Sequence, residues 1–477
     1  MKYTYRIMVI IAVFVTAMVG STVSAQEVSP VDFMRMNPYQ LKANPSTDLP
    51  YESVMSMVVG NIGINVQNAT LHYDNLFAFD AQGRPSVLDL RKFANSLKTN
   101  NYMGISANVD LFNLCRRLEK GLLSVDHRIK VEGDMRYNNG LFMLLGYGNS
   151  AFVGANNPAH LSMNVNAQVR QEFAVGYQRK VNNQLSVGGR VKMLFGAANI
   201  TTNVIDAKLY TDPDTYALGV EEKLVVYGAM PDVFYFDEDG QFKTNGHFRM
   251  ANLFRNPGFG VDLAATYQFN EQFSAVAAVH DLGFMHWGSN GIAMTSEIKD
   301  VGQFYENGGF HFGGLEMEQL ILLIDDMDYR EQFFDTLQQY VQLQFSPKEK
   351  YNTMLNTNLL LRGNYDLDAN NRFSAQLQGK FCGSGFRPAL TLAYAGSFNR
   401  MFDVCATYTI MRGSYDNLGL GVAGNFGTFH IYLTTNNVFG FFMPLNASAM
   451  NAQVGIVFNL WPEKTIIDES GMPEYLE

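Results

Sequence analysis

The chain has 477 residues, of which 47% are hydrophobic and 17% charged, and its formal net charge is −10. The acidic balance and the absence of any basic run argue against nucleic-acid binding. After residue 25 no apolar run approaches the roughly 20 residues of a membrane-spanning helix, so the hydrophobicity is distributed by alternation, as in sandwiches, soluble barrels and membrane barrels.

The N-terminus predicts export. Lys2 and Arg6 precede an apolar run at 7–19, and Val23-Ser24-Ala25 precedes Gln26. This pattern is typical of a secretory signal peptide at 1–25, and the run is too short for a membrane-anchor helix. We expect a periplasmic or plug segment at 26–53, a barrel at 54–461 and a C-terminal tail at 462–477.

The predicted strands share one pattern, in which apolar and polar residues alternate with a period of two. They lie at 54–67, 102–114, 123–137, 164–180, 185–199, in the two arms of 256–287, and at 355–367, 372–382, 388–398, 402–412, 417–426, 428–435 and 453–460. In 256–287 each arm is about ten residues long, which is the length that a tilted strand needs to cross a bilayer. A soluble sandwich is not expected to repeat strands of this length so often.

The polar face of the strand at 123–137 is almost entirely charged. In a soluble sandwich this face would meet solvent, whereas in a membrane barrel it would line a wet lumen where acids and bases pair across strands. Arg190 and Lys192 share the polar face of their own strand. The candidate lumen-lining residues are Asp126, Arg128, Lys130, Glu132, Asp134, Arg136, Arg190 and Lys192. They form either a permeation path or a structural salt-bridge network.

Connection lengths provide a second test, because outer-membrane barrels have short periplasmic turns and longer outer loops. With the N-terminus in the periplasm, the periplasmic connections at 115–121, 181–184, 270–272, 368–371 and 399–401 are all short. The long connections at 68–101, 138–163, 200–257, 285–354 and 436–452 all fall outside. Two further strand-like pieces, at 203–211 and 216–228, give 16 strands if they insert. We favour 14, with this hairpin outside.

Two outer connections contain helical patterns, at 88–97 and 329–342, and the second follows an apolar run at 320–324. Apolar faces on long outer loops must be buried against each other, inside the barrel mouth, or against a partner. Asp262 and Asp281 lie close to glycines, where they would mark either a strand bulge or a kink that opens a lateral gap.

The sequence contains few residues in catalytic or metal-binding patterns. His280 and His286 have no further ligand at zinc-like spacing, and the sequence contains no nucleophile elbow, P-loop or haem motif. The three cysteines, Cys115, Cys382 and Cys405, allow one disulfide but no framework. We therefore expect no enzyme activity, no cofactor and no metal.

Several segments resemble one family pattern. They are Asn149 with Asn157-Pro158, 189–196, Gly258-Phe259-Gly260-Val261-Asp262-Leu263 with Tyr267, Asp281-Leu282-Gly283-Phe284 with Trp287, and Asn417-Leu418-Gly419 with Gly421, Tyr432 and Asn436-Asn437. In this order they are similar to a family of exported bacterial barrels, carried as a domain of unknown function and related to FadL-type channels and PorV-type secretion proteins. The resemblance implies a 14-stranded outer-membrane barrel of a Gram-negative bacterium and no settled activity.

Two functions from different classes remain open. The first is a FadL-like barrel that passes or binds a hydrophobic or amphipathic small molecule. The alternative is a barrel plugged by its own loops, without transport, which serves as an interaction platform for secretion or surface-assembly proteins. In both, outer-membrane lipid surrounds the protein.

Overall fold

A computed structural model describes residues 28–34, 37, 39–49, 53–68, 73–80, 85–154, 156–216, 218–229, 235–236, 242–243, 254–289, 291–298, 329, 344–347, 350–383, 385–398, 401–411, 414–426, 429–442 and 449–462. The predicted signal peptide, the helical pattern at 329–342 beyond Tyr329, the apolar run at 320–324 and the tail after Pro462 lie outside these residues.

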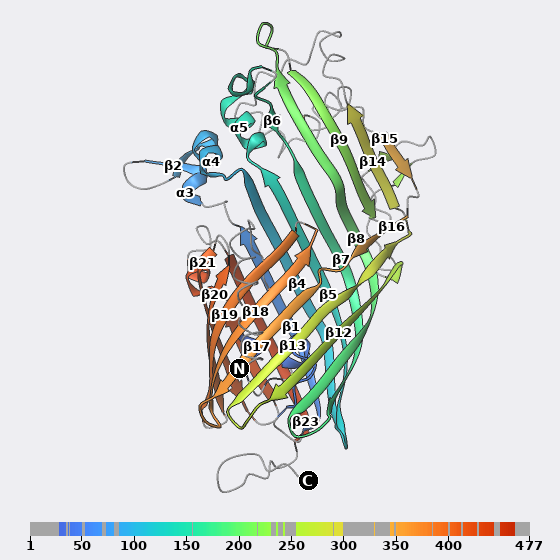
Figure 1. Ribbon diagram of the computed structural model, residues 1–477, viewed down its shortest axis with the longest axis vertical. Coiled ribbons are helices and arrows are strands. Elements are labelled where there is room, and N and C mark those ends of the chain that lie inside the picture. Colours follow the sequence, from blue (N-terminus) through green and yellow to red (C-terminus); the bar gives the residue numbers. More distant parts are fainter. Residues whose placement is uncertain are drawn as a thin grey trace, which may run out of the picture.

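Fourteen strands of the described chain pair antiparallel in chain order and close into a barrel, in which β1 pairs with β23 (Figure 1). The strands are β1 Ser53–Asn68, β4 Asn100–Leu118, β5 Gly121–Asn138, β7 Met163–Lys180, β8 Leu185–Thr211, β12 Asn256–Gln268, β13 Phe273–Trp287, β17 Asn358–Asp366, β18 Asn371–Cys382, β19 Gly385–Phe398, β20 Phe402–Met411, β21 Ser414–Asn425, β22 Phe429–Thr435 and β23 Ala449–Pro462. This confirms the all-β barrel and the preferred count of 14 strands.

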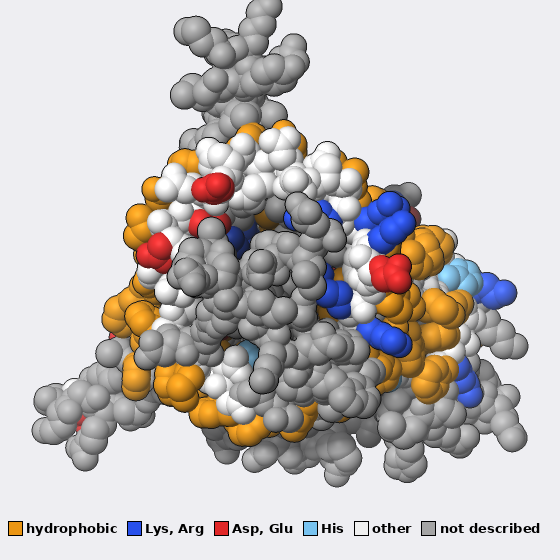
Figure 2. Space-filling model, turned by 90° about the horizontal axis from the view of Figure 1, so that it is seen from below, with side chains coloured by type: hydrophobic (Ala, Val, Ile, Leu, Met, Phe, Trp, Pro, Cys, Tyr) orange, Lys and Arg blue, Asp and Glu red, His pale blue; other side chains and the backbone are white. Residues whose placement is uncertain are grey.

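The wall is inverted relative to a soluble protein. Along β5 the charged residues Asp126, Lys130 and Glu132 are buried, whereas on neighbouring strands Ile105 and Val175 expose half of their surface. Seen from below, hydrophobic side chains surround the periphery of the molecule (Figure 2). Apolar residues outside and charges inside are the arrangement of a barrel whose solvent is lipid. Within the described residues no helix is long and apolar enough to cross a membrane.

The two ends of the barrel differ. At one end, here called the turn end, β4–β5, β7–β8, β12–β13 and β17–β18 are joined by at most four residues each. At the other, the loop end, only the connections at 383–384 and 412–413 are as short. The predicted segregation of short and long connections is therefore confirmed.

The sheet of the wall continues beyond the loop end (Figure 1). The 27-residue strand β8, about 90 Å long at ~3.3 Å per residue, leaves β12 and pairs there with β9. The predicted pieces at 203–211 and 216–228 belong to these two strands and do not enter the ring. The sheet is completed by β9 Leu218–Ala229, β14 Gly291–Ile298 and β15 Gln344–Pro347.

Short helices and strands lie at the loop end. The predicted helix at 88–97 is confirmed as α4, where the Asp89 side chain accepts a hydrogen bond from the Lys92 backbone N–H as an N-cap. The short elements at this end are α3 Tyr73–Leu76, α4 Leu90–Ser96, α5 Gly140–Tyr147, η2 Asn149–Phe152, α9 Val438–Phe442, β2 Phe77–Phe79, β3 Pro85–Leu88, β6 Ala159–His160, β10 Tyr235–Phe236, β11 Phe242–Lys243 and β16 Tyr351–Met354.

The N-terminal segment, the described residues within 28–49, packs against the inner face of the ring with η1 Pro30–Phe33 and α2 Gln40–Ala43. Val31 and Phe33 are buried against Cys405 and Tyr432. The Arg362 guanidinium lies 4.3 Å from the centre of the Phe33 ring. These contacts place the segment inside the barrel near the turn end.

Candidate functional site

The interior of the ring is crossed by a chain of buried ion pairs, here called the charge cluster. It begins on α2 and draws on β4, β5, β7, β8, β12, β13 and β18. Its members are Lys42, Asp110, Asp126, Arg128, Lys130, Glu132, Arg170, Glu172, Arg190, Lys192, Asp262, Asp281 and Lys380. Inward-facing positions of neighbouring strands lie opposite one another, so opposite charges meet across the register.

The centre of the charge cluster is Asp281. Its carboxylate lies 2.5 Å from Lys192 Nζ and 3.2 Å from Lys130 Nζ. Lys192 also contacts Asp262 at 2.6 Å, and Lys130 contacts Glu132 at 3.1 Å. Each lysine therefore has two acidic partners, and the buried charges are compensated.

Two arginines extend the charge cluster in opposite directions. Arg190 joins Asp262 at 3.0 Å to Asp126 at 2.5 Å. Arg170 joins Glu132 at 2.5 Å to Glu172 at 2.9 Å. Arginine suits these positions because its planar guanidinium can donate to two carboxylates at once.

The charge cluster also connects parts of the molecule that are distant in sequence. Lys42 of the N-terminal segment pairs with Asp110, which also accepts a hydrogen bond from Asn61. On the opposite wall, Lys380 Nζ lies 3.3 Å from Glu132. The lumen is thus bridged from α2 to β4 and from β18 to β5. The space left among these side chains is a polar cavity of about 120 Å³, room for only a few water molecules.

Above the charge cluster, toward the loop end, lies an apolar cap formed by Leu194, Ala229, Met285, Trp287 and Leu355. A Cβ at Gly196 would lie 2.4 Å from the indole ring of Trp287. Only glycine at this position therefore leaves room for the ring. The indole N–H donates to the Thr353 hydroxyl at 2.8 Å. The cap separates the charges below from the space above.

That space, here called the mouth cavity, has a volume of about 680 Å³. The inner faces of β7, β8 and β9 line one side, with Asn166, Thr201 and Tyr227, and the segment 351–357 lines the other. Tyr351 connects the mouth cavity to the apolar cap, because its ring stacks on Tyr227 and on Trp287. Its hydroxyl donates to Asn199 at 2.8 Å.

The wall beside the charge cluster contains a bulge in β13. Asp281 has φ of 55°, a left-handed conformation that few residues other than glycine adopt. The pairing of β12 with β13 shifts register between Val261 and Leu263. β13 changes partner here from β17 to β16. Of the two interpretations of the Asp262 and Asp281 region, the bulge is present, and it directs both His280 and Asp281 inward.

All eight candidate lumen-lining residues share the inward face of their strands, and seven of them are buried or half-buried. Asp126, Arg128, Lys130, Glu132, Arg190 and Lys192 join the charge cluster. Asp134 is buried and lies 3.7 Å from Arg387, whose guanidinium stacks on the Tyr102 ring. Arg136, near the loop end, is exposed.

Other members of the charge cluster were missed from the sequence. Asp110, Arg170, Glu172 and Lys380 lie on polar faces of predicted strands, so alternation could have found them. Lys42 carries no such signal, because α2 is too short to have a period.

Metal or disulfide groupings are not formed among the described residues. There, no group of three or more His, Cys, Asp or Glu side chains is arranged to hold a metal ion. His280 is buried, whereas His286 contacts Asn352 at an exposed position. Cys115, Cys382 and Cys405 form no disulfide with one another.

Comparison with known proteins gives one family and a set of barrel structures. A family model described as "Family of unknown function (DUF5723)" matches residues 45–436. No curated protein matches the sequence. A *Pseudomonas aeruginosa* FadL homologue is 9% identical, with 92% of this chain and 100% of that chain covered and a TM-score of 0.45. The *Pseudomonas putida* toluene transporter TodX is 9% identical, with 92% and 94% covered and a TM-score of 0.39. The *Ralstonia pickettii* toluene transporter TbuX is 12% identical, with 92% and 94% covered and a TM-score of 0.40.

Proposed function

The chain belongs to the family of unknown function DUF5723, and on that premise we propose that it is an outer-membrane barrel that binds a hydrophobic or amphipathic small molecule in the mouth cavity and passes it onward. In this proposal a signal peptide exports the chain, the turn end faces the periplasm and the loop end faces outward. The barrel is assigned no catalytic activity.

The mouth cavity is the observation that carries this proposal. Its volume falls in the range of about 300–1,000 Å³ that is typical of small-molecule sites. Tyr227, Tyr351 and Leu355 supply apolar surface, and Asn166 and Thr201 add a few polar groups. An amphipathic molecule matches such a mixed lining better than an ion, because the charges of the interior are already paired with one another.

Binding can be tested with the natural tryptophans. The sequence contains two, so Trp461→Phe leaves Trp287 as the single fluorophore, and Trp287 contacts the cavity-lining Thr353 and Tyr351. A brominated fatty acid should quench this fluorescence saturably. Thr201→Phe, which enlarges a side chain that lines the cavity, should weaken the saturable part, whereas Ala406→Phe on the outward face of β20 should not. Linear, unsaturable quenching in the Trp461→Phe protein would refute binding at this site.

Passage is a separate step and needs its own measurement. The charge cluster crosses the lumen below the mouth cavity, so onward movement has to pass these ion pairs or leave through the wall. Protein reconstituted in liposomes should accelerate uptake of an apolar solute relative to the Thr201→Phe variant. Uptake no faster than into protein-free liposomes would leave a binding protein without passage, and equal acceleration by both proteins would mean that the solute does not pass through the mouth cavity.

The bridged lumen favours the alternative function, a plugged barrel that acts as an interaction platform for secretion or surface assembly. The N-terminal segment packs inside the ring, and ion pairs join it to β4 and join β18 to β5 across the lumen. This alternative is supported if stoichiometric partners are recovered from outer membranes by a barrel that binds no brominated fatty acid. Absence of such partners, together with saturable quenching, would reject it.

A further inference from the structure

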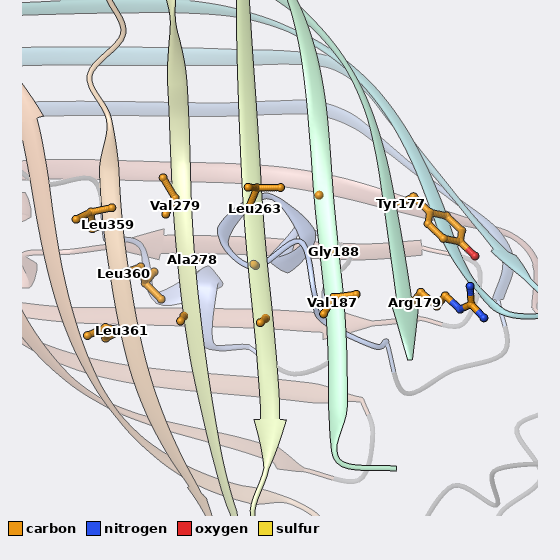
Figure 3. A pocket seen from close by; sticks show the side chains of 14 residues that line it. Tyr177, Arg179, Val187, Gly188, Leu263, Ala278, Val279, Leu359, Leu360 and Leu361 are labelled. Carbon is orange, nitrogen blue, oxygen red and sulfur yellow. The ribbon is translucent and has the colours of Figure 1, made fainter. Parts of the chain in front are cut away.

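A groove of about 780 Å³ lies on the outward face of the ring, across β7, β8, β12, β13 and β17 (Figure 3). It is distinct from the mouth cavity, since its walls are formed by residues on the outward faces of these strands. Leu263, Val279, Leu359 and Leu361 give it apolar walls. In a barrel embedded in a bilayer, this face meets lipid.

The groove exists because small residues coincide in adjacent strands. One row across the wall reads Arg179, Val187, Ala265, Ala277 and Leu361, each paired in register with the next. The two alanines leave a depression between Val187 and Leu361. In the row above, Gly189 is equally small.

The floor of the groove is made of small residues, and the N-terminal segment contacts it from inside the barrel. The inward neighbours in the same strands are also small: Gly188, Ala264 and Ala278 pair with one another. A Cβ at Gly188 would lie 1.9 Å from the Pro45 carbonyl oxygen, so the N-terminal segment rests directly on this part of the wall. Ser46 and Thr266 are joined by a hydroxyl–hydroxyl hydrogen bond of 2.7 Å. The groove is therefore preformed.

The depth of the groove in the membrane follows from the aromatic residues. Exposed aromatics gather near the turn ends of the strands, where an interfacial aromatic girdle is expected. They include Tyr177, Tyr267, Phe269, Phe273, Phe373 and Phe429. Arg179 lies two residues beyond Tyr177 toward the turn end, at the edge of the groove (Figure 3). This is the level at which lipid head groups begin.

Arg179 is exposed, and no described acidic side chain forms an ion pair with it. A guanidinium binds phosphate through two parallel hydrogen bonds. We propose that the groove is a specific site for a glycerophospholipid of the leaflet at the turn end, with one acyl chain over Ala265 and Ala277 and the phosphate on Arg179. The site depends on the barrel being in a membrane and is independent of binding in the mouth cavity.

The test compares two probes with the same acyl chains, phosphatidylethanolamine and diacylglycerol, by native mass spectrometry of detergent-purified protein. The phospholipid should bind about tenfold more tightly, or about 1.4 kcal/mol, because diacylglycerol lacks the phosphate that the Arg179 guanidinium binds. Arg179→Gln should remove this difference and leave diacylglycerol binding unchanged. Ala277→Phe should weaken both probes.

Matched variants separate the groove from general lipid adhesion. Arg116→Gln removes another exposed arginine near the turn end, on β4, and Ala406→Phe enlarges an outward alanine on β20. Both should bind like the wild type. Ala265→Leu is the second groove variant if Ala277→Phe does not assemble. Equal binding of the two probes to the wild type, equal losses in Arg116→Gln and Arg179→Gln, or full binding by the groove variants would overturn the proposal.

Discussion

Asp281 shows how single residues are constrained in this interior. It accepts two lysines, and its backbone adopts a left-handed conformation so that its side chain and that of His280 both face inward. Most members of the charge cluster have two partners of opposite charge. The consequence of removing one therefore depends on what its neighbours retain.

We predict that Lys130→Gln destabilises the barrel far less than Glu172→Gln does. Without Lys130, Asp281 keeps Lys192 and Glu132 keeps Arg170, so the cost should be about 1 kcal/mol. In the described chain, Glu172 is the only carboxylate within ion-pair distance of Arg128. Its loss leaves a half-buried guanidinium without an acidic partner and should cost about 3 kcal/mol. Guanidinium unfolding in detergent measures both free energies. Equal values would contradict the pairing described above.

At Asp281 we expect the backbone to discriminate between substitutions. Asn tolerates a φ of 55°, whereas a β-branched residue there is strained by about 1–3 kcal/mol. Asp281→Val should therefore melt well below Asp281→Asn in a heat-modifiable gel-mobility assay. Leu282→Val, at the adjacent position, serves as the control. A similar midpoint for the two Asp281 variants would exclude a strained bulge.

At the scale of elements, β5 joins the charge cluster to the lipid-facing surface. Lys130 and Glu132 are buried in the ion pairs, and Ile129 and Val131 take the opposite face between them. A strand with these two faces can cross a membrane in only one orientation about its axis, because a slip of one residue would put every charge into lipid.

Ile129→Arg and Val131→Arg should each damage barrel assembly. An arginine near mid-membrane on a lipid-facing position costs roughly 2–4 kcal/mol, whereas Lys130→Gln leaves the outer surface unchanged. The heat-modifiable mobility of the three variants decides this. Normal assembly of Ile129→Arg together with failure of Lys130→Gln would mean that the two faces of β5 are reversed.

At the scale of the whole molecule, the barrel is assembled around its own N-terminus. Cys405 is buried beneath η1, and Cys115 packs with Leu41 and Leu49 of the N-terminal segment. Cys382 lies at the other end of the barrel, in the last position of β18. The three thiols, none of them in a disulfide, therefore report on whether the segment is in place.

Deleting residues 28–49 should expose two of these thiols to maleimide. In the wild type we expect labelling of Cys382 alone, because Cys115 and Cys405 are 4% and 0% exposed. In the deletion variant Cys115 and Cys405 should label as well, while Cys382 labels at an unchanged rate and serves as the internal control. Peptide mass spectrometry assigns the labelled sites. Continued protection of both thiols would show that something other than this segment covers them.

The sequence by itself determined the strands, their two faces and the two ends of the barrel. Alternation with a period of two and the length of a connection are local properties, so Ile129 and Lys130 could be assigned to opposite faces without knowing their neighbours. For the same reason the charged residues of 123–137 were identified as a set before any contact was known. The family pattern added the expectation of 14 strands. The pairing of β1 with β23 fulfils it, because it closes the ring after the fourteenth strand.

The contacts that make a site were decided by tertiary structure alone. Lys42 meets Asp110 and Lys380 meets Glu132 across 68 and 248 residues of chain, and such pairs depend on closure of the ring and the path of the N-terminal segment. Arg136 shares the polar face of its strand, yet it is exposed because it lies near the loop end. Ala265 and Ala277 are unremarkable in sequence and form a groove only because the register of three strands places them side by side. Register and closure are properties of the whole barrel, which no single strand encodes.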